Sequence, residues 1–104
     1  MRQGVIFLAA ALWLSNGAAF AQDVDELYKT KNCFACHRID RHHHAPTFKE
    51  IAAKYAAESG AEAKLVKKVR EGGAGVWGQA PMPPQAQVTE EEAVTLVRWI
   101  LQLK

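Results

Sequence analysis

The chain has 104 residues, a formal net charge of +2 at pH 7 and only two cysteines. This length leaves room for one domain and excludes a second. With 13 basic and 11 acidic side chains, the composition gives no indication of the clustered basic face that binds nucleic acid, so we expect no nucleic-acid partner.

The first 21 residues have the pattern of a cleaved secretory signal. Arg2 precedes an unbroken run of ten apolar residues, and the segment closes on Ala19-Phe20-Ala21, which is an A-x-A cleavage pattern. We therefore expect cleavage after Ala21 and a mature domain of residues 22–104. An uncleaved membrane anchor is the alternative, but ten apolar residues fall short of the roughly 20 that span a bilayer.

A first short helix is expected to begin at Asp23 and to end near Asn32. Asp23 and Glu26 have the three-residue spacing of a capping box, and Leu27 and Tyr28 lie on one apolar face. Asparagine tolerates the left-handed backbone conformation that often closes a helix, which favours an end at Asn32.

The most informative segment follows this helix and reads Cys33-Phe34-Ala35-Cys36-His37. Its Cys-x-x-Cys-His spacing is that of a c-type haem attachment site, in which each thiol bonds one vinyl group and the histidine ligates the iron. Two alternatives remain open at this point. A redox dithiol would need a βαβ context, for which the sequence shows no strand pattern. A zinc site would need two further ligands, which could come from the histidines at positions 42–44.

Two helices are expected between this motif and the next loop. The first follows Pro46 and runs from Thr47 to about Ser59, with apolar residues at helical spacing. The second begins at another capping box, Ser59-Gly60-Ala61-Glu62, and ends at the glycine pair 72–73.

Residues 72–88 hold four of the seven glycines and three of the four prolines, which predicts a loop without regular structure. Thr89 and Glu92 then form a third capping box, and the acidic first turn suits the positive end of a helix dipole. The last helix is expected to reach about Leu103 and to be largely buried, because its polar positions form one narrow stripe.

Met82 is the candidate for the second axial ligand of a haem iron. It is the one methionine left once the signal is removed, and methionine ligation raises the reduction potential and suits electron transfer. Pro81 and Pro83 restrict the backbone on both sides, which reduces the entropy lost when the thioether binds iron. The alternative is a methionine that fills a gap in the core.

Together these features resemble the small bacterial class I cytochromes c, the group of cytochromes c-551 and c-552. The resemblance spans the mature chain and rests on three motifs in order: Cys33-Phe34-Ala35-Cys36-His37, Gly75-Val76-Trp77-Gly78 and Pro81-Met82-Pro83-Pro84. It implies an all-α fold of four to five short helices wrapped around one covalently bound haem c. Both cysteines would attach the haem, with His37 and Met82 as axial ligands.

The resemblance also implies roles for three further residues. The Pro46 carbonyl would accept a hydrogen bond from the ligand histidine, which orients the ring and raises its basicity. Trp77 would bond a haem propionate, and Lys68 matches a basic residue near a propionate.

The clearest departure from this family is Arg41-His42-His43-His44-Ala45, where Ala45 replaces a usual glycine. Histidine side chains gain charge near neutral pH, so this segment is sensitive to pH. We interpret it as a solvated loop. A pH-dependent or partner-specific docking surface is one alternative, and binding of a metal or of the haem iron is another.

The function implied by the resemblance is a periplasmic, mobile one-electron carrier of a respiratory chain, which is not an enzyme. The implied partners are redox proteins: a quinol-oxidising complex upstream, and a terminal oxidase, nitrite reductase or peroxidase downstream. We expect a monomer without a stable membrane anchor. The alternatives are a haem-binding subunit of a larger redox complex and a gas-binding or peroxidase-type haem protein.

Overall fold

The computed structural model describes residue 4 and residues 23–104, so the predicted secretory signal lies outside the described residues. The described residues form four α-helices, one short 3₁₀ helix and no strand. These are α1 (Val24–Thr30), η1 (Cys33–Ala35), α2 (Phe48–Tyr55), α3 (Ala61–Glu71) and α4 (Glu90–Leu101). The predicted all-α fold is confirmed.

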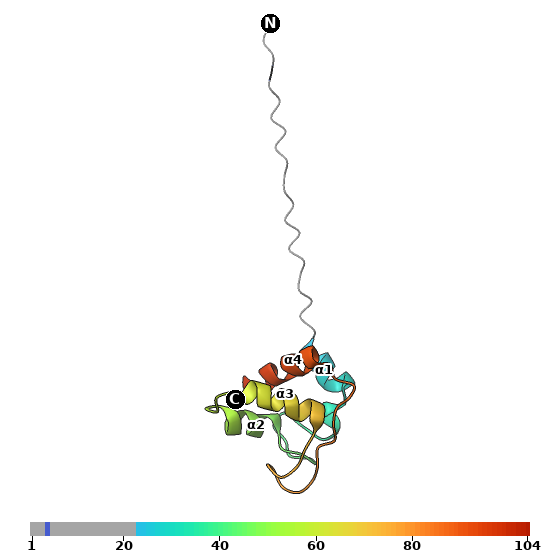
Figure 1. Cartoon of the computed structure of the whole chain (residues 1–104), viewed down its shortest axis with the longest axis vertical. Coiled ribbons are helices and arrows are strands. Elements are labelled where there is room, and N and C mark those ends of the chain that lie inside the picture. The colour runs from blue at the N-terminus through green and yellow to red at the C-terminus, as the bar shows by residue number, and fades with distance from the viewer. Residues whose placement is uncertain (1–3, 5–22) are drawn as a thin grey trace.

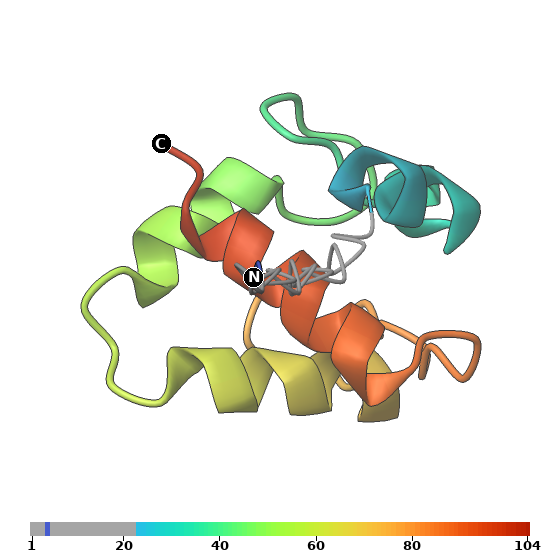
Figure 2. The ribbon, with the colours of Figure 1, turned by 90° about the horizontal axis from the view of Figure 1, so that it is seen from above.

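Helix α4 forms the centre of the core and contacts α1, α2 and α3. Figures 1 and 2 show it lying across the other helices, with α3 running beneath it. Its residues Ala93, Leu96 and Val97 are at most 1% exposed, whereas Arg98 and Gln102 face solvent. The prediction that this helix is largely buried is therefore confirmed.

Two helix starts follow their predicted capping residues. Thr89 Oγ1 accepts the Glu92 N–H at 3.1 Å, and the Glu92 carboxylate accepts the Thr89 N–H at 3.0 Å, so the capping box of α4 is complete. In α1, Asp23 accepts the Asp25 N–H at 3.0 Å. Among the described contacts the Glu26 side chain accepts no hydrogen bond from the Asp23 N–H. Helix α1 therefore has the predicted N-cap but not the complete capping box.

The capping box predicted at Ser59 is wrong. Gly60 adopts a left-handed conformation (φ 76°) and is itself the N-cap of α3, with no side-chain cap. Because the chain reverses at Gly60, Ser59 lies outside the helix and cannot reach its first N–H groups. The preceding helix also ends at Tyr55, earlier than predicted, since the following residues form tight turns that begin with a Glu58 N–H to Tyr55 O bond.

An ion pair that sequence reasoning missed joins the end of α1 to α4. Glu92 is 8% exposed, and its Oε2 lies 3.3 Å from Lys31 Nζ. Lys31 also donates to the Gln87 carbonyl, and the Gln87 amide donates to the Lys31 carbonyl. The backbone hydrogen bond from Thr89, aided by Lys31, holds the pKa of Glu92 below its usual value.

Replacing Glu92 with glutamine is expected to lower the free energy of unfolding at pH 7 by about 1 kcal/mol, because the amide retains the cap but loses the charge that faces Lys31. The folded-state pKa of Glu92 is lowered, so its contribution is present above the unfolded pKa and disappears as pH falls through the folded one. Urea unfolding at pH 7 measures the loss of stability, and urea unfolding near pH 3 measures whether this loss disappears once Glu92 is protonated. The exposed neighbour Glu90 supplies the control, Glu90→Gln, and an equal loss in both variants would contradict the prediction.

Candidate haem attachment site

The Cys-x-x-Cys-His motif is folded into one tight turn between α1 and α2. Asn32 has the predicted left-handed conformation, with φ 68°, and redirects the chain into η1. The His37 and Cys36 N–H groups both donate to the Cys33 carbonyl, at 2.9 and 3.2 Å. Cys33 is half-buried and Cys36 is exposed. The turn therefore presents two thiols and one imidazole from a single short segment.

His37 is held in one orientation by its neighbours. Its Nδ1 lies 2.8 Å from the Pro46 carbonyl oxygen, the contact that the resemblance implies. Because a carbonyl only accepts, the proton sits on Nδ1 and Nε2 keeps the lone pair that binds metal. The ring also stacks on Phe48, with ring centroids 5.1 Å apart. Burial lowers the pKa of His37, while the bond to Pro46 opposes this shift.

The backbone of this turn is tied to both flanking helices. Tyr28 of α1 donates its hydroxyl to the His37 carbonyl at 2.7 Å. The Ala45 N–H donates to Cys36 O, and the Phe48 N–H at the start of α2 donates to Arg38 O at 2.8 Å. Sequence reasoning placed Tyr28 and Phe48 on apolar helix faces and missed these supporting contacts.

Tyr28→Phe is expected to lower the free energy of unfolding of the haem-loaded protein by about 1 kcal/mol, because the His37 carbonyl loses its bond in a partly buried place. Tyr55 is similarly buried, and among the described residues its hydroxyl makes no hydrogen bond, so Tyr55→Phe is the matched control. Urea unfolding of the two variants makes the comparison, and equal stabilities would contradict a role for this bond.

Met82 is anchored in the 72–88 loop by a small backbone ladder. Gly73 and Met82 exchange two hydrogen bonds, from Gly73 N to Met82 O at 3.0 Å and from Met82 N to Gly73 O at 2.8 Å. The Met82 side chain is half-buried. The ladder joins Met82 to the residues directly after α3, and so the loop has a defined position although it contains no helix.

Trp77 of this loop and Lys68 of α3 lie at different parts of the structure. Trp77 is 47% exposed, and Lys54 Nζ of α2 lies 5.5 Å from its ring centroid. Lys68 of α3 instead lies against Gly73. The structure thus brings Lys68 to the Met82 ladder and Trp77 to Lys54, a neighbour that the sequence pattern did not indicate.

The donor set and the exposed apolar side chains fit a covalently bound haem. Phe34, Val76 and Trp77 are 38%, 45% and 47% exposed. They come from the two segments that carry the cysteines and the methionine, and exposed apolar side chains of this kind are typical of a surface that binds a ligand or a partner. These features define a helical protein of the covalent haem class.

The two alternative uses of the cysteines fit less well. Among residues 23–104, no group of three or more histidine, cysteine or acidic side chains is arranged to hold a metal ion. The alternative of a zinc site therefore has no support in these residues. Burial raises the pKa of the Cys33 thiol, whereas a redox dithiol relies on a lowered one.

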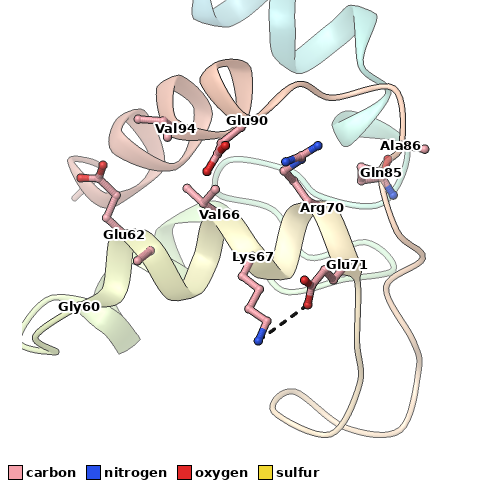
Figure 3. A pocket seen from close by; sticks show the side chains of 11 residues that line it. Gly60, Glu62, Val66, Lys67, Arg70, Glu71, Gln85, Ala86, Glu90 and Val94 are labelled. Carbon is pink, nitrogen blue, oxygen red and sulfur yellow. Dashed lines mark ion pairs between the residues drawn. The ribbon is translucent and has the colours of Figure 1, made fainter.

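A separate hollow of about 790 Å³ lies between α3 and α4. Figure 3 shows charges of both signs around it, including Lys67 and Glu71, which pair at 3.9 Å. It contains no residue of the three motifs.

Comparison with known proteins agrees with this site. The profile of the cytochrome c family matches residues 21–104. Cytochrome c-551 of Pseudomonas aeruginosa is 46% identical over 97 residues, which cover 93% of this chain and 91% of that protein. Cytochrome c-552 of Nitrosomonas europaea is 44% identical over 98 residues, which cover 94% and 92%. The crystal structure of wild-type cytochrome c552 from Nitrosomonas europaea gives a TM-score of 0.75 at 45% identity and covers 77% of this chain and 99% of that one.

The chain therefore belongs to the cytochrome c family, among the small bacterial class I cytochromes named c-551 and c-552. Members of this family carry electrons on one haem c bound through two cysteines, and in this chain these are Cys33 and Cys36. The predicted family, fold and cofactor are confirmed.

Proposed function

We propose that the protein is an exported, mobile one-electron carrier, with His37 and Met82 as the axial ligands of its haem iron. The observation that carries this proposal is the backbone ladder that holds Met82 to Gly73. A thioether fixed in this way suits a closed coordination site, whereas gas-binding and peroxidase-type proteins need an open one. Methionine opposite histidine also raises the reduction potential, which suits electron transfer.

When bound, haem c supplies an iron that gains or loses one electron. The chain's part is to keep both ligands in place, so that little rearranges as the electron moves. The Pro46 carbonyl orients His37, and its hydrogen bond adds to the basicity of the ring against the effect of burial, which would favour binding of the metal. Phe48 covers one face of the ring, while Trp77 and Lys68 are the proposed partners of the propionates.

Export rests on the signal predicted in residues 1–21, which leaves a mature domain of residues 22–104 and a periplasmic location. None of the helices described in residues 23–104 has the length and apolar character needed to cross a bilayer. We propose redox proteins of a respiratory chain as partners: a quinol-oxidising complex as donor, and a terminal oxidase, nitrite reductase or peroxidase as acceptor.

An anaerobic redox titration of the purified mature protein, followed by visible spectroscopy, tests the function. We expect one reversible one-electron transition, a low-spin spectrum in both oxidation states and no rapid binding of carbon monoxide. A high-spin ferric spectrum with rapid carbon monoxide binding would instead place the protein in the gas-binding class.

A further inference from the structure

The segment of residues 38–44, called here the histidine loop, begins and ends at the haem attachment turn. It follows His37 directly, and the Ala45 N–H behind it donates to the Cys36 carbonyl at 3.2 Å. Figure 2 shows this segment as a loop that projects beside α1 and α2. Any protein that contacts the loop therefore lies close to the cysteines that attach the haem.

Three histidines stand exposed on this loop, and their neighbours are charged. The rings of His43 and His44 have centroids 4.0 Å apart, and His42 Nε2 lies 4.0 Å from the Glu50 carboxylate of α2. Arg38 lies over the exposed Phe34 ring, 5.8 Å from its centroid, so the charged loop is continuous with an apolar edge.

A hollow of about 440 Å³ opens within the loop. The residues that line it are Tyr28, Arg38, Ile39, Asp40, Arg41, His42 and His43. Two arginines and two histidines around one hollow can surround the carboxylate of another protein.

The histidines raise the positive charge of this surface as the pH falls. Arg38 and Arg41 of the loop, and Lys49, whose backbone N–H donates to Ile39 O at 3.1 Å, are positive, and Asp40 and Glu50 are negative. Burial raises the pKa of Tyr28, so the tyrosine stays neutral near pH 7. Histidines gain charge as pH falls through about 6.5, and the surface then becomes more positive. Burial, followed by the nearby His44 and Arg38, lowers the pKa of His43, so His43 adds its charge late in this range.

We propose that the histidine loop is the docking surface for an acidic patch on a redox partner, and that docking strengthens as the pH falls. The proposal rests on the proposed carrier function. The acidic partner follows from charge complementarity with the arginines and protonated histidines. Since the loop closes on the attachment turn, docking there brings the partner close to the haem-bearing segment, and an acidified periplasm would favour the encounter.

A gold electrode coated with a sulfonate-terminated monolayer serves as the acidic probe, because sulfonate keeps its charge across the pH range used. The haem-loaded protein is compared at about pH 5.5 and about pH 8, on either side of the ordinary histidine range. A quartz-crystal microbalance measures the adsorbed mass, and voltammetry on the same film measures electron transfer. We expect roughly tenfold tighter adsorption at the lower pH, lost at high ionic strength, and no pH response on a hydroxyl-terminated monolayer.

Three variants separate the loop from other titrating groups, the propionates included. The triple variant His42→Gln, His43→Gln, His44→Gln should lose the pH response. The triple variant His42→Lys, His43→Lys, His44→Lys should adsorb tightly at both pH values. Lys67→Gln, which removes a charge from α3, should keep the full response.

Each outcome decides between the two proposals. Equal adsorption at both pH values, or an unchanged response in the glutamine variant, would overturn the docking surface while a reversible wave still supports the carrier function. The opposite result is adsorption that depends on the loop and on pH, with no reversible voltammetric wave on either monolayer. That result would support the docking surface and overturn the carrier function.

Discussion

The Met82→Ala variant is expected to have a high-spin ferric spectrum and to bind carbon monoxide rapidly in the ferrous form. Alanine offers no donor atom, so the sixth position would pass to water or remain open. Losing the thioether should also lower the reduction potential by on the order of 0.1 V, since axial ligands set the potential over about 0.8 V across haem proteins. Visible spectroscopy, carbon monoxide mixing and a redox titration measure the three effects.

The matched control is Gln79→Ala, which removes an exposed side chain from the same loop and should leave all three properties unchanged. An unaltered low-spin spectrum in Met82→Ala would show that another side chain ligates the iron. The exposed histidines at positions 42–44 would then be the first candidates.

The haem motif and the irregular loop that carries Met82 were the parts of the site that the sequence predicted best. Cysteines and a histidine within five residues must share one turn, and prolines and glycines prevent a regular helix in residues 72–88. These are local constraints that do not depend on the rest of the fold. The axial role of Met82 remains a prediction, and so do the propionate contacts of Trp77 and Lys68.

The helix starts show where local patterns stop being sufficient. Thr47 with Glu50, and Ser59 with Glu62, have the same spacing, yet only the first pair forms a capping box. Gly60 takes the left-handed conformation and moves the start of α3 past Ser59. The spacing of cap residues does not encode where the chain turns.

The supporting contacts of the site depend on tertiary packing and had no signal in the sequence. The Tyr28 hydroxyl reaches His37 O only because α1 packs against the attachment turn. Lys54 reaches Trp77 only because the loop folds back toward α2. Tyr28 and Lys54 both lie at ordinary helical positions in the sequence, so their partners can be identified only from the structure.

Gly72→Ala is expected to be strongly destabilising. Gly72 ends α3 with φ 71°, and a Cβ there would collide with the Met82 carbonyl oxygen and come within 2.9 Å of the Pro83 and Pro84 backbone. The backbone of Gly72 (φ 71°, ψ −165°) lies in a region that is essentially restricted to glycine and costs an alanine about 1–3 kcal/mol, and relieving the collision costs about 1–3 kcal/mol more. We expect a total loss of roughly 2–6 kcal/mol in the free energy of unfolding.

The collision also predicts a spectroscopic effect. The backbone atoms that meet the new Cβ belong to Met82 and its two following prolines, so the loop must shift away from α3 to relieve the contact. That shift loosens the Gly73–Met82 ladder, and we expect a fraction of the ferric protein to lose methionine ligation and become high-spin. Urea unfolding and the visible spectrum of the ferric protein measure the two consequences separately.

Gly60→Ala is the control in which a positive-φ glycine is replaced without a collision. Gly60 has a similar φ of 76°, but nothing lies within 4 Å of the position its Cβ would take. With ψ 11°, Gly60 is in the left-handed αL conformation, which costs an alanine about 1–2 kcal/mol, together with the small loss of a favourable N-cap residue, and alanine there meets no neighbour. The difference between the two variants therefore combines the close approach between α3 and the methionine loop with the greater backbone strain at Gly72. If both variants lost equal stability and both kept a low-spin spectrum, the end of α3 would have no part in positioning Met82.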